Sequence, residues 1–169
     1  MPTIRANDTW IRFEQKGEPG WPTVVLVHGE KSSADAQWLD TGWVERLSAA
    51  KRRSVRFDLR GHGRSERRRG TVNDSLDVFL GDLEEILRYA NARSVDLFGW
   101  GLGAEIGLEL VKRKPGRVRS LVVGGLAANA GELAKLPVPS FVIPETGAAA
   151  SQPPFDAVLE FLDGVERSR

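Results

Sequence analysis

The sequence contains no cysteine, and His28 and His62 are its only two histidines among 169 residues. Without cysteine the chain can form neither disulfides nor thiolate metal sites, so a cytoplasmic location is the simplest expectation and no metal site is expected. No apolar run approaches the roughly 20 residues that span a bilayer, and the opening MPTIRANDTWIRF lacks the apolar core of a secretory signal. A net charge of +1 gives no general attraction to nucleic acid or to a membrane. We therefore expect neither as a partner.

Short apolar runs alternate with helical segments along the chain. Runs typical of strands lie at 23–27, 54–59, 94–98, 118–123 and 140–143, and helical spacing covers 34–49, 72–92, 104–114 and 155–165. Before them, segments 3–6 and 9–15 flank the turn-prone pair Asn7-Asp8 and predict an antiparallel hairpin. This order predicts one α/β domain over residues 1–169. Its architecture would be a three-layer sandwich around a mostly parallel sheet of about seven strands, or six.

Four segments of the chain resemble parts of the α/β-hydrolases, in that family's order. TVVLVHGE at 23–30 is similar to the strand and oxyanion loop, and VRFDLRGHGRS at 55–65 to the next strand and its turn. The stretch 96–123 is similar to the nucleophile strand, elbow, helix and following strand, and LPVPSFVI at 136–143 to a later strand. The resemblance implies an α/β-hydrolase fold without a cap domain, because residues 124–137 leave no room for a lid of helices.

The elbow of that family reads G-x-S-x-G, with the serine as nucleophile. Here it reads Gly99-Trp100-Gly101-Leu102-Gly103, so Gly101 stands where the serine would be. Glycine has no side chain with which to attack a carbonyl. The resemblance also implies a base histidine after the last strand, where Ala148 is the nearest equivalent, and an acid for which Glu145 is the candidate. We expect no hydrolysis by the family's route, and a binding or interaction protein.

The resemblance leaves the backbone of the elbow intact. The amides of Leu102 and of Gly29 or Glu30 would form a nest of N–H donors, at a turn whose αL-like conformation suits glycine. The ligand-binding candidates are His28, Gly29, Glu30, Trp38, Trp100, Gly101 and Leu102. We expect a small acyl- or carboxylate-like ligand, or a protein partner, at this open face.

Two other interpretations stay open. One is an enzyme that works without a covalent intermediate, such as a lyase, cyclase or decarboxylase, with His28, Glu30, Asp35 or Asp58 as the acid or base. In that set, Asp58 fits better as a support for the loop that follows its strand. The other interpretation is a minimised or engineered hydrolase scaffold.

We expect no cofactor, and we expect self-association. Gly99-x-Gly101-x-x-Ala104 matches a dinucleotide motif, but the next strand ends VVGGL and offers no acidic residue for a ribose. An uncovered edge at 140–143 predicts a homodimer through that edge or through the helix at 155–165. Light scattering at high protein concentration tests this expectation.

Overall fold

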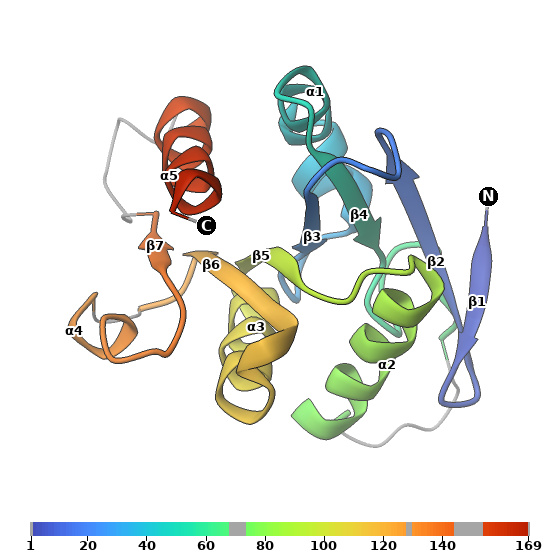
Figure 1. The fold of residues 1–169 in the computed structure, drawn as a ribbon. Helices are drawn as coiled ribbons and strands as arrows, with labels where there is room; N and C mark the ends of the chain where they lie inside the picture. The colour runs from blue at the N-terminus through green and yellow to red at the C-terminus, as the bar shows by residue number, and fades with distance from the viewer. Residues whose placement is uncertain (1, 68–73, 128–129, 144–153, 169) are drawn as a thin grey trace.

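The computed structural model describes residues 2–67, 74–127, 130–143 and 154–168, whose strands form one sheet (Figure 1). The strands are β1 (Thr3–Ala6), β2 (Thr9–Lys16), β3 (Thr23–Val27), β4 (Arg53–Phe57), β5 (Val95–Trp100), β6 (Val118–Gly124) and β7 (Ser140–Val142). The α-helices are α1 (Trp43–Ala49), α2 (Leu76–Tyr89), α3 (Leu102–Arg113), α4 (Ala130–Leu133) and α5 (Phe155–Arg167). Of these helices, none has the length and apolar character needed to cross a membrane.

The sheet is mostly parallel, as the sequence predicts. Its order is β1-β2-β4-β3-β5-β6-β7, and β1, β2 and β4 pair antiparallel while the pairs from β4 to β7 are parallel. All five residues of β3 are buried, which explains its unbroken apolar run at the centre of the sheet. The position of β7 at the end of the sheet is confirmed, and a homodimer through it stays a prediction.

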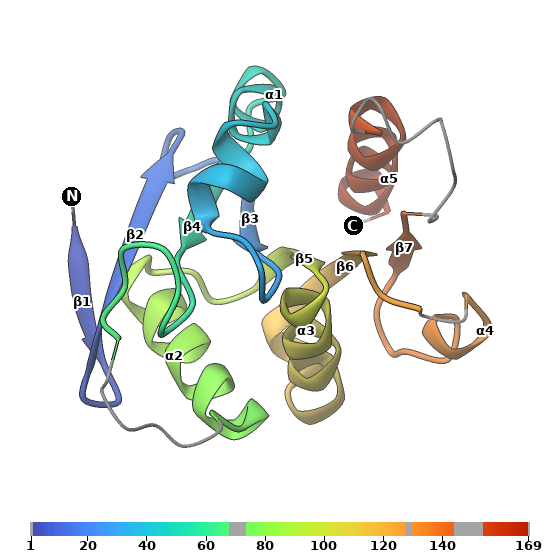
Figure 2. The same cartoon turned by 180° about the vertical axis from the view of Figure 1, so that it is seen from behind.

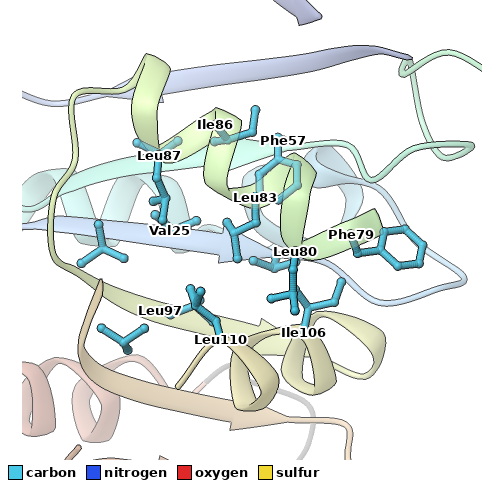
Figure 3. Close-up of a cluster of buried hydrophobic side chains, with 14 of the residues drawn as sticks. Val25, Phe57, Phe79, Leu80, Leu83, Ile86, Leu87, Leu97, Ile106 and Leu110 are labelled. Atoms are coloured by element: carbon cyan, nitrogen blue, oxygen red, sulfur yellow. The ribbon is translucent and has the colours of Figure 1, made fainter. Parts of the chain in front are cut away.

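Helices cover both faces of the sheet, which confirms the three-layer architecture. Figures 1 and 2 show α2 and α3 on one face and α1 and α5 on the other. On the first face, Figure 3 shows apolar side chains of α2 and α3 meeting Val25, Phe57 and Leu97 of the sheet. On the second face, Trp43 stacks edge-to-face on Phe98, with ring centroids 4.7 Å apart. Burial of apolar surface on both faces therefore holds the sheet in the middle.

The helical segments differ from the prediction at their ends. Instead of one helix over 34–49, a short π-helical segment, Asp35–Leu39, is separated from α1 by Gly42 at φ 88°. A left-handed residue cannot continue a right-handed helix, so the apolar spacing runs across a break. The described part of the helix expected at 72–92 is α2, which begins after Ser75; the Ser75 side chain makes no capping hydrogen bond.

The helix expected from residue 104 begins two residues earlier, directly after Gly101, because glycines let it approach the strands. A Cβ on Gly103 would overlap the carbonyl group of Val27 and lie 2.8 Å from the carbonyl oxygen of His28. A Cβ on Gly99 would overlap the backbone of Gly103 in turn. The first turn of α3 thus rests on the carboxyl ends of β3 and β5, where a side chain has no room.

We predict that Gly103→Ala lowers the free energy of unfolding by about 3 kcal/mol, because the new methyl group forces α3 away from β3. Gly164→Ala is the matched control, since no heavy atom lies within 4 Å of its added Cβ in α5. At that half-buried position in the helix the same change should raise stability by roughly 0.5–1 kcal/mol, because the added methyl group meets no neighbour. Urea denaturation of the two variants measures both values, and equal midpoints would contradict the close packing.

Candidate functional site

The elbow joins β5 to α3 through one residue, Gly101. Its backbone lies at φ 54° and ψ −118°, and its N–H donates to the carbonyl oxygen of Gly124 at 2.9 Å. Its own carbonyl oxygen accepts from the amides of Ala104 and Glu105, which starts the helix. The positive φ agrees with the sequence prediction, but the ψ lies outside the αL region, so the expected αL-like turn is wrong in that angle. A residue with a side chain is strained at these angles, whereas glycine adopts them freely.

The side chain of Glu30 reaches the nest at the start of α3. Its Oε2 accepts a hydrogen bond from the backbone N–H of Leu102 at 3.2 Å. Hydrogen bonds from its own backbone amide and from that of Leu102 lower the pKa of the Glu30 carboxyl below its usual value. The Leu102 amide, one of the amides that the sequence predicts for an oxyanion nest, therefore donates to a carboxylate from the chain itself.

The Glu30 carboxylate also borders the space where a nucleophile would stand. A Cβ added to Gly101 would lie 3.1 Å from Oε2 of Glu30 and 3.6 Å from the Cα of Gly29. A side chain at position 101 would thus point at the carboxylate, which would have to move by a few tenths of an ångström. The charge of Glu30 occupies the neighbourhood in which a hydrolase needs its attacking group.

His62 positions the backbone of Glu30, a role that the sequence did not reveal. One ring nitrogen, Nε2, lies 2.8 Å from the carbonyl oxygen of Glu30. The other, Nδ1, lies 2.9 Å from the carbonyl oxygen of Arg60. The ring therefore lies between two carbonyl oxygens, one in each of the loops that follow β3 and β4, and it ties these loops together.

His28 is a structural residue and not a ligand-binding one. Its ring is fully buried; Nε2 accepts from the backbone N–H of Leu59 at 2.9 Å, and Nδ1 donates to the carbonyl oxygen of Gly29 at 2.7 Å. Burial lowers the pKa of His28, so the ring is neutral at pH 7. The structure corrects the expectation that His28 contacts a ligand, because its two polar atoms are already engaged.

The two tryptophans proposed for the open face lie in different environments. Trp38 is fully buried and packs edge-to-face on Phe98, with ring centroids 4.6 Å apart. It therefore does not line the elbow, which corrects that part of the prediction. Trp100 is half-buried beside the elbow, and its ring covers Gly124 and Gly125, where any Cβ would overlap it. The two glycines of VVGGL thus leave room for the ring of Trp100, a role that could not be recognised from the sequence.

The carboxylates considered as acid or base are held in structural contacts. Asp58 is buried and accepts from the backbone N–H of Ala34 at 2.7 Å and of Arg64 at 3.0 Å, so it supports the loop after β4 as expected. Asp35 forms ion pairs with Arg12 and Arg56. No cluster of potential metal ligands occurs among the residues that the structure describes.

Glu145 and Ala148, the candidates for the acid and base positions, lie outside the described residues. The set that the structure does bring together at the elbow is Gly29, Glu30, Trp100, Gly101 and Leu102. A signal for the role of Glu30 was present in the sequence: an acidic residue directly follows the His-Gly pair of the oxyanion loop.

Comparison with known proteins places this geometry in a family. Residues 22–147 match the family described as alpha/beta hydrolase fold. Rhodomycin D methylesterase DauP from Streptomyces sp. (strain C5) is 32% identical over 157 residues, covering 83% of this chain and 52% of the methylesterase. A dihydrolipoyllysine-residue acetyltransferase component of an acetoin cleaving system from Pseudomonas putida is 33% identical over 121 residues, covering 70% and 30%.

Solved structures share the fold at low sequence identity. Epoxide hydrolase VrEH1 from Vigna radiata superposes with a TM-score of 0.68 at 23% identity, over 76% of this chain and 40% of that one. The enol-lactonase from Burkholderia xenovorans LB400 gives a TM-score of 0.65 at 24% identity, over 73% and 46%. The chain thus spans about half the length of the methylesterase and less than half of these structures.

We predict that the Glu30 carboxyl titrates at a lower pH in the folded chain than in the chain unfolded by guanidinium. Because the folded pKa is depressed, the contact stabilises the fold above the unfolded pKa and is lost as the pH falls through the folded pKa. Carbon-detected NMR of the side chain measures the shift, and the Leu102 amide signal should follow the same curve.

The matched control for that titration is Glu30→Gln, which removes the charge and should abolish the pH response of the Leu102 amide. If Glu30 titrates alike in both states while the Leu102 amide stays constant, the nest does not hold this carboxylate.

Proposed function

Because this chain belongs to the alpha/beta hydrolase fold family, we propose that it acts as a binding protein that does not hydrolyse substrates by the family's nucleophilic route. Its elbow would receive the carboxylate of a ligand or of a protein partner. The observation that carries the proposal is the Glu30 carboxylate on the Leu102 amide, next to a nucleophile position occupied by glycine.

The chemistry of the elbow opposes acyl transfer in two ways. Gly101 supplies no atom that can form a covalent intermediate. The oxyanion nest, which would stabilise the negative charge of a tetrahedral intermediate, already faces the negative charge of Glu30. A second oxyanion at that place would be repelled by the first until the Glu30 side chain moved away.

The same arrangement favours binding of a carboxylate. Backbone N–H groups at a helix N-terminus attract anions, and the Leu102 amide already donates to a carboxylate oxygen, which supports this preference. Glu30 is exposed at the surface, so its side chain can swing out and yield the amides to an incoming group of the same chemistry. Trp100, half-buried beside Gly29, offers apolar surface for the rest of that group.

A non-covalent enzyme at this site has no suitable base among the four acid or base candidates that the sequence names. His28 is neutral, buried and fully hydrogen-bonded, and Asp35 and Asp58 are held in ion pairs or by backbone amides. Glu30 is accessible, but its lowered pKa makes it a weaker base than an ordinary glutamate. No contact in the structure favours this alternative over binding.

We predict that Glu30→Ala raises the affinity of the elbow for acetate by about tenfold, because the variant removes the competing internal carboxylate. The Leu102 amide signal in a ¹H–¹⁵N NMR titration reports binding at the nest itself. The matched control is Glu105→Ala, which removes an exposed carboxylate in the first turn of α3 without vacating the nest.

In that control the acetate affinity should rise far less than in Glu30→Ala. An equal rise of the acetate affinity in both variants would mean that the affinity responds only to the loss of a negative charge near the start of α3. If acetate leaves the Leu102 amide unchanged in Glu30→Ala, the elbow is not a carboxylate receptor.

A further inference from the structure

A cavity lies at the edge of the sheet opposite the elbow, at the amino ends of the parallel strands. It has a volume of about 570 Å³, within the usual range for small-molecule sites. Its lining comes from the loop before β3, the first residues of β3 and β4, the loop before β5, and single residues of β6 and α5. These lining residues are Pro19, Gly20, Trp21, Pro22, Thr23, Arg53, Asn91, Ala92, Arg93, Ser94, Arg119 and Glu166. We refer to it as the amino-end cavity.

Arg53 is a buried cation in this cavity without an acidic partner in the described part of the chain. It is only 9% exposed. Its Nε donates to Oγ1 of Thr23 at 3.0 Å, and its Nη2 donates to the carbonyl oxygen of Ala90 at 2.9 Å. Ala90 follows the last turn of α2, where the helix offers only a partial negative charge. A buried guanidinium that meets only neutral groups costs free energy, which an anion from outside would recover.

The protonation behaviour of Arg53 agrees with this contact pattern. Burial lowers its pKa, and no carboxylate acts in the opposite direction. By contrast, the buried Arg60 has its pKa raised by the hydrogen bonds that it donates to Asp82. The difference between two buried arginines of one chain marks Arg53 as the one whose charge is uncompensated.

Arg119 lines the same cavity, but its charge is already paired. Its Nη2 donates to Oδ2 of Asp96 at 2.9 Å and to the carbonyl oxygen of Thr23 at 3.1 Å. Arg93, by contrast, is exposed at the rim and forms no ion pair within the described ranges. Arg53 and Arg93 are therefore the two arginines of the described lining that have no carboxylate partner in an ion pair.

We propose that the amino-end cavity binds a small molecule through a phosphate group, with Arg53 and Arg93 as the charged contacts. Neither arginine forms an ion pair among the described residues, and a phosphate monoester has several oxygens that can accept from both guanidinium groups, which a single carboxylate does less well. Guanidinium groups bind phosphate oxygens through paired N–H donors. Trp21 in the lining offers an aromatic face to the remainder of the molecule.

This site is independent of the proposed carboxylate receptor. The elbow lies where β5 ends, at Trp100, whereas Arg53 is the first residue of β4 and Thr23 the first of β3. Loss of one site therefore leaves the other in place, and each has its own NMR reporter.

The test uses inorganic phosphate and phenyl phosphate as probes, with acetate as the reference anion. Both phosphates should shift the guanidinium signals of Arg53 and Arg93 and leave the Leu102 amide unchanged. Phenyl phosphate should bind more tightly than inorganic phosphate if Trp21 contacts the ring. The affinity should fall as the salt concentration rises. The proposal would be overturned if acetate bound at this cavity as tightly as phosphate, or if the NMR signals of the two arginines did not change.

Two variants make the test independent of folding. Arg53→Gln should lower phosphate affinity most, and Arg93→Ala, at an exposed position, should lower it by about tenfold with an unchanged thermal midpoint. Arg88→Ala is the matched control, because Arg88 is an exposed arginine that pairs with Glu85 and does not line the cavity. If Arg93→Ala and Arg88→Ala weaken binding equally, the attraction is general and the cavity is not the site.

Discussion

The close approach of α3 to the carboxyl ends of β3 and β5 is the constraint on which the elbow depends. It requires glycine at positions 99 and 103, because a methyl group at either would overlap backbone atoms. With the helix so near, the amide of Leu102 comes within reach of the loop that carries Glu30. Gly101 then needs backbone angles that strain any other residue. The backbone angles of Gly101 and the nest beside it are two results of the same packing.

A nest of backbone N–H donors can serve either catalysis or the binding of an anion. In an esterase of this fold it stabilises the negative oxygen that forms when a serine attacks. Here the attacking atom is missing and a carboxylate stands in its neighbourhood, so the remaining interaction is attraction between N–H groups and an anion. In the proposed function, glycine at the nucleophile position leaves this frame to bind an anion. The supporting contacts made by His28, His62 and Asp58 are directed at the loops and not at a substrate.

Much of the fold could be predicted because it follows from periodicity. A continuous apolar run such as TVVLV has to be buried on both faces, and the order of strands and helices then gives a parallel sheet. The glycine at the nucleophile position could be recognised equally well, because it is a single residue within the elbow motif. The break at Gly42 was harder to see, because apolar residues on both sides of it pack into the same core.

The occupant of the nest and the burial of Trp38 could not be predicted in the same way. Whether a glutamate points to solvent or back at a helix depends on contacts with residues far along the chain, in this case Leu102. Trp38 carries an aromatic ring that suits either a core or a ligand, and only its position against Phe98 decides between them. The uncompensated Arg53 likewise emerges only when five separate segments meet at one end of the sheet.

The most direct measurement of the central claim is the intact mass of the purified chain after incubation with a fluorophosphonate probe. Such probes form a stable bond with an activated serine, and the elbow has none. The account predicts an unchanged mass for the folded chain and no ester turnover above that of the unfolded chain. A mass increase of one probe that maps to the region of Gly101, accompanied by ester turnover, would contradict it.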